Sequence, residues 1–551
     1  MSLNNDSTVA VLDAEIREKT LAEQDLGSFN NFINTGLPQI ITQLFQVSHE
    51  IRNERGQLEE DKGIENISFN VKFTKVRITE PVINQYSSGK KITLYPDYAR
   101  ENNLNYSAGL IVNADITAKA FSKDGEPVVR TESVFDYAIA DIPIMVGSCK
   151  CNTYNMSKET KKNIHEDPTD PGGYFIIKGG EWVIDMMESR LFNYPHIFRN
   201  IGYKKEITRL EFLSKPGDAY ENSAEIKLLY LVDGNIQLHI MSNENLKKVP
   251  IPFWLIFRLF GMPTDKELFD NIVYDYEGPV SAHMIKILKL SFKADRTFQS
   301  LWYVTDPAKI LDELAERTTQ AKTQSYSGEP RRDETTLRYM RNNIMKILDK
   351  TILPHIGLSP ESRHDKLRYL GWLIHKLLLV EMEIVPSTDR DSLVNKRIHS
   401  AGDAYAKVLK MHYNMTVIQT LKKEFVKAFH NLPFSQVPLA QTFRNSIQTR
   451  NLEQAIVKAI GSGTKEASSG GRSTGNRLAS ENLHRKNQMN FYATLRVIRT
   501  PSSGASSSKK DQRADEMRRV HPSYIGYIGI IQSADTGDAV GLVKQLALGA
   551  G

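Results

Sequence analysis

The side chains that could bind a nucleotide for hydrolysis are confined to one short segment. GSGTK at Gly461–Lys465 superficially resembles a phosphate-binding loop. Such a loop requires the spacing G-x-x-x-x-G-K-[ST] and a strand before it. Here the spacing differs, and the helix-like segment Leu452–Ile460 stands where the strand is required. Nucleotide hydrolysis is therefore a minor hypothesis, which loss of nucleotide binding in Lys465→Ala would revive.

The sequence indicates neither a catalytic residue nor a metal ligand. Asp389 and Asp391 flank Arg390, with basic residues close behind, which favours an ion-pair corner over a Mg²⁺ site. Cys149 and Cys151 are the chain's two cysteines, so no second pair exists to complete a four-cysteine zinc site. The motifs H-E-x-x-H and G-x-S-x-G are absent. These residues favour binding over catalysis.

Basic side chains are concentrated in residues 471–520, which we call the basic strip. It holds 11 Lys/Arg and four Asp/Glu, a local excess of seven charges, whereas the whole chain carries +6. Such a cluster is typical of a surface that binds a polyanion, with a solvated basic loop as the alternative. The predicted nucleic-acid-binding residues are Arg472, Arg477, Arg485, Lys486, Arg496, Arg499, Lys509, Lys510, Arg513, Arg518 and Arg519.

The basic strip contains an ordered element between two flexible loops. Half of Gly461–Ser480 is Gly or Ser, a composition that cannot build a core, and Pro501–Ser508 is a shorter segment of the same kind. The intervening Glu481–Thr500 is expected to form a helix or a strand pair. The loops would therefore present the basic side chains from a fixed base.

Strands are predicted in the first half of the chain. Ile67, Phe69, Val71 and Phe73 alternate strictly, and the alternation resumes one residue out of phase at 76 and 78, which indicates a β-bulge. Hairpin turns are expected at three dipeptides. They are Asp124-Gly125, Gly179-Gly180 and Asp233-Gly234.

Helices are predicted to dominate from Arg258 onward. Apolar residues between 370 and 378 follow the spacing of a buried helix, within which His375 is expected to be a satisfied boundary residue. Tyr405–Phe429 is a second long helix or pair. An earlier helical stretch, 33–44, should break or start at Gly36-Leu37-Pro38. The fold class is therefore α+β and multidomain.

No segment is expected to enter a membrane. Charged residues and a histidine interrupt the apolar stretch Tyr369–Val385, and spanning would need about 20 nearly uncharged residues. Met1–Gln24 is polar, lacks the apolar core of a secretory signal, and is expected to be frayed or loosely docked.

Collinear motifs over about 400 residues resemble the second-largest subunit of multisubunit DNA-directed RNA polymerases. The segment DIPIMVGSCKC…EDPTDPGGYFIIKGGEWVI (Asp141–Ile184) is similar to that family's PxMxxS and D-x-G-G-Y-F-I-I-x-G-x-E motifs. Five further blocks follow in the family's order. They are IPFWLIFRLFGM from 251, ILPHIG from 352 with YLGWLIHKLLL from 369, TDRDSLVNKRIHSAG from 388, ATLRVIRT from 493, and RRVHPSYIGYI from 518 with GLVKQLA from 541.

The resemblance implies a protrusion formed by residues 1–195 and 401–450, an inserted lobe at 196–400 and a fork region with two loops at 451–551. In the family those loops lie at the downstream edge of the RNA–DNA hybrid. Arg496 corresponds to the first arginine of an L-R-R motif whose second position is Val497 here. RRVHPSYIGYI with QSADTG (Gln532–Gly537) most resembles the type of large cytoplasmic DNA viruses related to African swine fever virus; most cellular relatives have E-T-P-E-G there.

The resemblance also implies a role within a complex. The expected partners are the largest polymerase subunit, the remaining C-terminal part of the second-largest subunit, smaller subunits, the DNA template and the RNA–DNA hybrid. Mg²⁺ would be held through the largest subunit, and this chain would bind no cofactor. If the protein is viral, it would act in the host cytoplasm or in the virion. The alternative is a free-standing nucleic-acid-binding factor, which co-purification with a large complex would exclude.

Overall fold

The computed structural model forms two compact units. Unit 1 is Met1–Ser189 with Asp391–Gly551, and unit 2 is Arg190–Arg390. Both contain helices and strands, so the predicted α+β, multidomain class is confirmed. The described residues are 21–44, 47–52, 64–84, 91–122, 127–199, 206–217, 220–241, 249–295, 298–301, 304, 306–323, 334–461, 479–501, 517–532, 540–547 and 550.

The main sheet of unit 1 is antiparallel, in the order β1-β2-β5-β6. The four predicted alternating side chains from Ile67 to Phe73 are all buried on one face. The β2–β5 register shifts between Phe73 and Lys75, which confirms the predicted bulge. The strands are β1 (Val47–Arg52), β2 (Ile64–Ile78), β5 (Ser107–Ser122) and β6 (Val128–Pro143).

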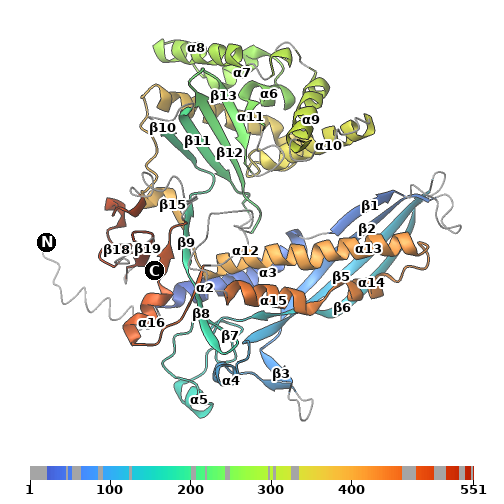
Figure 1. Cartoon of the computed structure of the whole chain (residues 1–551), viewed down its shortest axis with the longest axis vertical. Helices are drawn as coiled ribbons and strands as arrows, with labels where there is room; N and C mark the ends of the chain where they lie inside the picture. Colours follow the sequence, from blue (N-terminus) through green and yellow to red (C-terminus); the bar gives the residue numbers. More distant parts are fainter. Residues whose placement is uncertain are drawn as a thin grey trace. The chain divides into compact units, whose positions relative to one another are not determined.

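A long helix runs along this sheet (Figure 1). It confirms the helix predicted for Tyr405–Phe429, and Phe425 and Phe429 stack on Phe69 with ring centroids 5.1 and 5.8 Å apart. Such pairs add to the energy of apolar burial. The helical segments are α12 (Ala401–Tyr413), the π-helical turn η7 (Asn414–Ile418), α13 (Gln419–Asn431), α14 (Leu439–Ser446) and α15 (Thr449–Ile460).

The predicted helix break at Gly36-Leu37-Pro38 is wrong. The helix continues through α2 (Glu23–Asn31), the π-helical turn η1 (Phe32–Gly36), α3 (Leu37–Gln39) and a second π-helical turn, η2 (Ile40–Leu44). Pro38 lies in the first turn of α3, where its missing N–H costs little. The π-helical turns η1 and η2 on either side let the helix continue past the proline.

Smaller sheets of unit 1 have the orders β15-β9-β17-β19-β18, β16-β8-β7 and β3-β4. The predicted hairpin near 179 is present, but its turn centres on Lys178 and Gly179, whose φ angles are 50° and 77°. The β5–β6 pairing agrees with the hairpin predicted there, although Asp124-Gly125 lies outside the described residues.

The remaining elements of unit 1 are β3 (Val82–Asn84), β4 (Lys91–Thr93), α4 (Pro96–Glu101), α5 (Lys158–Asn163), β7 (Phe175–Ile177), β8 (Gly180–Ile184), β9 (Met186–Arg190), η6 (Leu393–Asn395), β15 (Lys396–His399), β16 (Ser480–Asn482), α16 (Gln488–Leu495), β17 (Val497–Arg499), η8 (Pro522–Tyr524), β18 (Ile528–Gly529) and β19 (Val543–Leu546).

Unit 2 is an antiparallel five-stranded sheet in chain order, covered by helices (Figure 1). The predicted turn at Asp233-Gly234 joins β12 to β13. Its elements are β10 (Pro195–Arg199), β11 (Glu206–Ser214), β12 (Ala224–Leu231), β13 (Ile236–Ile240), β14 (Ile251–Pro252), α6 (Phe253–Leu259), α7 (Asp265–Ile272), α8 (Pro279–Ala294), η4 (Gln299–Leu301), α9 (Pro307–Thr323), α10 (Glu334–Thr351), η5 (Pro360–Ser362) and α11 (Arg363–Glu381).

Helix α11 carries the predicted buried face. Its apolar residues at 370, 373, 374, 377 and 378 are fully buried in one core with the sheet. His375 donates from Nδ1 to the Ile272 carbonyl oxygen at 2.9 Å, which confirms a satisfied boundary histidine. Among the described residues, no helix is long and apolar enough to cross a bilayer.

The two ends of unit 2 are bonded to each other. The Ile197 backbone N–H donates to the Thr388 hydroxyl at 3.0 Å, and the Thr388 N–H donates to the Ile197 carbonyl at 2.8 Å. Unit 2 is therefore an insertion whose entry and exit segments lie side by side.

Candidate nucleic-acid interface

Six of the predicted nucleic-acid-binding residues lie in the described part of the basic strip. They are Arg485, Lys486, Arg496, Arg499, Arg518 and Arg519. The other five, namely Arg472, Arg477, Lys509, Lys510 and Arg513, lie outside the described residues, as do most of the two predicted loops. The ordered element between the loops is β16, α16 and β17, so a strand and a helix are both present.

Arg496 follows helix α16 and is buried, with 5% of its surface exposed. Its guanidinium donates to the carbonyl oxygens of Leu21 at 3.4 Å, Ala547 at 2.5 Å and Ala550 at 2.7 Å. Burial lowers the pKa of Arg496. This side chain therefore joins the segment before α2 to the segment after β19.

Arg499 on β17 is held by two carboxylates. Nε pairs with Asp185, which lies between β8 and β9, and an Nη2 hydrogen bond of 2.9 Å joins it to Glu481 on β16. The side chain of Arg499 is 11% exposed and that of Asp185 is fully buried. Because one guanidinium joins β17 to β16 and to the connection between β8 and β9, Arg499 positions the base of the basic strip.

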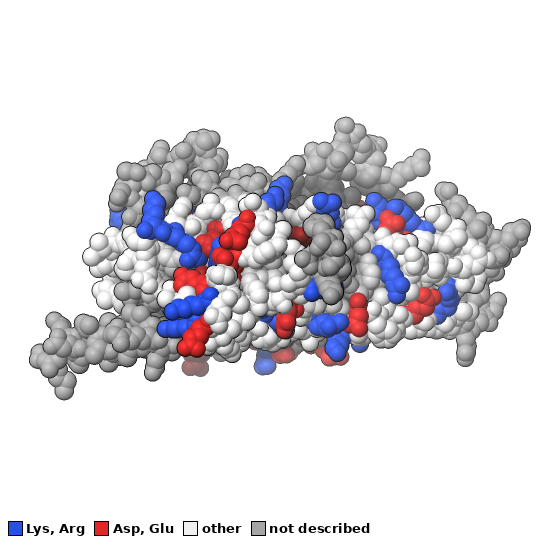
Figure 2. All heavy atoms as spheres, turned by 90° about the horizontal axis from the view of Figure 1, so that it is seen from below, with Lys and Arg blue, Asp and Glu red and all other residues white. Residues whose placement is uncertain are grey.

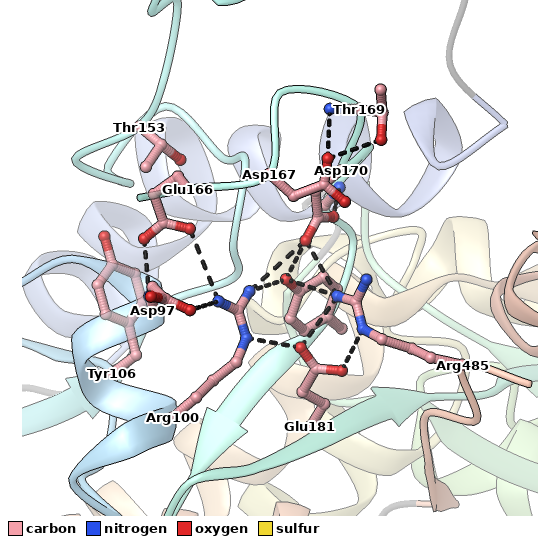
Figure 3. Close-up of polar contacts among 12 residues, drawn as sticks. Asp97, Arg100, Tyr106, Thr153, Glu166, Asp167, Thr169, Asp170, Glu181 and Arg485 are labelled. Atoms are coloured by element: carbon pink, nitrogen blue, oxygen red, sulfur yellow. Dashed lines mark hydrogen bonds and ion pairs between the residues drawn. The ribbon is translucent and has the colours of Figure 1, made fainter. Parts of the chain in front are cut away.

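The guanidinium carbons of Arg485 and Arg100 lie 5.3 and 5.8 Å from the ring centroid of the buried Tyr174, and we call this group the two-arginine cluster. Figure 3 shows both arginines meeting at Glu181. Arg485 Nε lies 2.7 Å from Glu181 Oε2, and Arg100 Nε lies 2.7 Å from Glu181 Oε1. The Tyr174 hydroxyl donates to Asp170 Oδ2 at 2.5 Å and accepts from both guanidinium groups. Burial raises the pKa of Tyr174, so the hydroxyl keeps its proton as a donor.

The two-arginine cluster forms part of the wall of an open pocket of about 840 Å³. Helix α4, the segment after α5, the β7–β8 turn and the residues after β16 form its lining. Figure 2 shows one face of the molecule, on which the blue and red side chains of the described residues lie interleaved in small groups. The charges visible on that face thus form mixed groups.

The remaining described basic residues differ in exposure. Lys486, before α16, and Arg519, before η8, are exposed. Arg518 is half-buried and donates from Nη1 to the Val540 carbonyl at 2.5 Å. Lys486 and Arg519 are therefore the described candidates best placed to reach a phosphate, and nucleic-acid binding stays a prediction for all six described residues.

Sequence reasoning missed a buried lysine pair. Lys544 on β19 and Lys396 on β15 hold the buried Glu188 at 2.8 and 3.2 Å, and the Thr500 hydroxyl donates to the same carboxylate at 2.9 Å. Burial acts to raise the pKa of Glu188, but the two ammonium groups outweigh it and the pKa falls. Lys396 lies in the block TDRDSLVNKRIHSAG and Lys544 in GLVKQLA, and this placement in family-like blocks was the sequence feature that could have identified them.

Comparisons with known proteins agree with the motifs. A family model described as "RNA polymerase beta subunit" matches residues 20–450, and one described as "RNA polymerase Rpb2, domain 3" matches residues 481–551. DNA-directed RNA polymerase II subunit 2 of Arabidopsis thaliana is 25% identical over 98% of this chain and 42% of its own length. DNA-directed RNA polymerase subunit Rpo2N of Methanothermobacter thermautotrophicus is 27% identical over 98% of this chain and 94% of its own.

The extent of these matches differs among the relatives. A relative from Encephalitozoon cuniculi, also named as an RNA polymerase II subunit, is matched over 43% of its length. The chain thus spans less than half the length of most of these relatives, and nearly all of Rpo2N.

Proposed function

The chain belongs to the RNA polymerase beta subunit family, and we propose on that basis that it works as the N-terminal part of the second-largest subunit of a DNA-directed RNA polymerase. There it would bound the DNA cleft and hold the template and the RNA–DNA hybrid. The observation that carries the proposal is the ordered match of two family models to residues 20–450 and 481–551. The protrusion, lobe and fork assignments form part of the same proposal.

We assign bond formation to other polypeptides. Two-metal chemistry needs several clustered carboxylates, and the described residues bring no three His, Cys, Asp or Glu side chains into a metal-binding group. We propose that Mg²⁺ is held through the largest subunit and that the purified chain alone does not polymerise nucleotides. This chain would contribute position and electrostatics.

Within that role, the basic residues of the strip divide into two groups. Arg485, Arg496, Arg499 and Arg518 hold segments of unit 1 together through carboxylates, carbonyls and a tyrosine. Lys486 and Arg519 are exposed and would contact the sugar–phosphate backbone, as would the predicted residues outside the described ranges. Phosphate contacts carry no sequence information, which suits a general transcriptase.

An exposed apolar group around β18 supports a protein partner. Val520, Ile525, Tyr527, Ile530 and Ile531 are between 54% and 94% exposed. Clustered exposed apolar residues of this kind mark interaction sites. We propose that the remaining part of the second-largest subunit covers them, within an assembly that includes the largest and smaller subunits.

We also propose that the chain is of the viral type. RRVHPSYIGYI with QSADTG supports this, because Ser533, Ala534, Asp535 and Thr536 stand where most cellular relatives have the first four residues of E-T-P-E-G. The complex would then act in host cytoplasm or be packaged in the virion. Recovery of the chain from purified virions or cytoplasmic extracts of infected cells tests this, and its recovery from uninfected host nuclei would contradict it.

Co-purification tests the complex, and salt dependence tests the contacts. The chain should elute in a complex of several hundred kilodaltons that extends RNA on a template; elution alone would favour a free-standing nucleic-acid-binding factor. Within the complex, Lys486→Ala with Arg519→Ala should weaken binding to an RNA–DNA hybrid scaffold equally for different sequences. The slope of log K against log salt should fall by about one unit per lost phosphate contact.

The matched control for that variant is Lys158→Ala, which removes an exposed charge from helix α5. Its salt slope should equal that of the wild type. A slope unchanged by the double substitution would remove Lys486 and Arg519 from the interface without affecting the result of co-purification.

A further inference from the structure

Glu188 lies at the centre of a buried polar group, which we call the Glu188–lysine cluster. Its carboxylate lies 2.8 Å from Lys544 Nζ on β19 and 3.2 Å from Lys396 Nζ on β15. It also accepts a hydrogen bond of 2.9 Å from the hydroxyl of Thr500, the residue that follows β17. Lys544 donates in turn to the Tyr524 hydroxyl of η8 at 3.0 Å. One carboxylate on β9 thus links three other strands and η8.

The charges of the Glu188–lysine cluster are compensated. The side chains of Glu188, Lys544 and Lys396 are 2%, 7% and 10% exposed, and Lys396 Nζ also lies 3.9 Å from the partly exposed Asp391. Burial acts to lower the pKa of Lys544, but the charge of Glu188 and the hydrogen bonds outweigh it and the pKa rises. A buried ion pair stabilises a fold no better than apolar packing would, so what the pair positions is the relevant question.

Both described stretches of the basic strip are attached to the Glu188–lysine cluster. The first stretch, 479–501, contains Thr500, and the second, 517–520, leads directly into η8. The ring of Tyr524 is buried in a small apolar core together with residues of β9, β17 and β18. The Ser523 hydroxyl accepts a backbone N–H of η6 at 3.0 Å. The turn that follows the second stretch is therefore fixed by polar and apolar contacts together.

A second attachment lies on the other side of Arg519. Arg518 Nη1 donates to the Val540 carbonyl oxygen at 2.5 Å. The backbone of Arg518 also lies against Gly541, because a Cβ placed on this glycine would be 2.3 Å from the Arg518 carbonyl oxygen. Val540 and Gly541 come shortly before β19, the strand that carries Lys544. The chain is thus held on both sides of Arg519 by one short segment.

Arg519 itself has a fixed backbone and an open side chain. It is exposed, and within the described part of the chain its guanidinium makes no hydrogen bond or ion pair. Holding a binding group in place beforehand lowers the entropy that is lost when a ligand binds. A guanidinium presented in this way suits a phosphate, to which it can donate two parallel N–H bonds.

We propose that Glu188 is a positioning residue of the nucleic-acid interface, which fixes η8 through Lys544 and Tyr524 and so holds Arg519 in place to contact a backbone phosphate. This inference rests on the proposed function, which supplies the nucleic acid. Glu188 is buried and touches no ligand itself, so its effect on binding passes through Arg519. Its bond to Thr500 fixes the end of β17 from the same carboxylate.

A double-mutant cycle in the purified complex tests the proposal. Tyr524→Phe removes the hydroxyl that joins η8 to Lys544 and retains the buried ring. It should weaken binding to an RNA–DNA hybrid scaffold by about two- to tenfold, the range that corresponds to ordering one further side chain. In an Arg519→Ala background the same substitution should weaken binding no further, because the two residues act as one unit.

The matched control is Tyr154→Phe, at a tyrosine before α5 that is 46% exposed, and it should bind the scaffold as the wild type does. Equal weakening by Tyr524→Phe with and without Arg519, or no weakening in either background, would overturn the positioning role, since a purely structural role does not depend on Arg519. A wild-type complex that does not bind the scaffold would overturn the proposed function and this inference together.

Amide hydrogen exchange gives a second measurement that does not involve binding. In the complex without nucleic acid, backbone amides of residues 518–524 should exchange faster in Tyr524→Phe than in the wild type, because η8 is no longer tied to β19. Glu188→Gln, which removes the charge and retains the shape, should accelerate exchange in the same residues; where that variant does not fold, Tyr524→Phe carries the test. Exchange unchanged by Tyr524→Phe would show that the cluster does not hold this segment, and the proposal would be wrong.

Discussion

At the scale of the residue, the basic strip shows that a positive charge in a sequence need not be a charge on a surface. Arg496 and Arg499 were predicted as phosphate contacts, and the structure gives both guanidinium groups partners within unit 1. Arg499 is bonded to Asp185, 314 positions away in the sequence. No local pattern could reveal such a partner, whereas the exposure of Lys486 agrees with the simpler reading of a solvated cation.

We expect Arg499→Met to be strongly destabilising, because it leaves the buried Asp185 and the partly buried Glu481 without their cation. Breaking one partner out of a buried ion pair costs about 3–5 kcal/mol. Lys486→Ala, a substitution at an exposed position, should change stability by no more than about 0.5 kcal/mol. Urea unfolding of the full chain, with amide exchange followed in β8 and β17, measures both. Similar values for the two variants would contradict a structural role for Arg499.

At the scale of the element, close approach of backbones decides where small residues are needed. Gly402 lies in the first turn of helix α12 beside α2, and a Cβ placed there would lie 2.3 Å from the Ser28 carbonyl oxygen. Gly27 lies on the exposed side of α2 and has nothing within 4 Å of its Cβ position. The two glycines therefore have different reasons to be present.

Gly402→Ala should separate α2 from α12 and destabilise unit 1, by about 1–3 kcal/mol for an overpacked contact. Gly27→Ala should instead stabilise the chain by about 0.5–1 kcal/mol, because alanine favours a helix. Thermal unfolding of both variants measures the difference. Equal effects of the same sign would show that the α2–α12 contact is not as close as described.

Local periodicity predicted many of the elements, and long-range contacts account for the failures. The bulge in β2 and the buried face of α11 were predicted because the strand alternation and the helical spacing of apolar residues each extend over fewer than 20 consecutive residues. The break predicted at Pro38 was wrong because π-helical turns accommodate the proline. The two-arginine cluster and the Glu188–lysine cluster were missed because their members come from segments hundreds of residues apart.

At the scale of the whole molecule, unit 2 has a core of its own. Every residue of the large apolar cluster around α11 lies between Ile197 and Val380. A region with its own core and adjacent ends can in principle fold alone. Residues 190–390 expressed alone should therefore unfold in a single cooperative transition, as measured by circular dichroism with heating. A gradual, non-cooperative loss of signal would show that unit 2 depends on unit 1.

The pairing of Ile197 with Thr388 has an evolutionary consequence. An inserted domain whose two ends are hydrogen-bonded to each other can change in length or sequence without altering the path of the chain on either side of it. Diverging lineages would then be free to vary unit 2 to suit new accessory proteins, provided that they kept the paired ends.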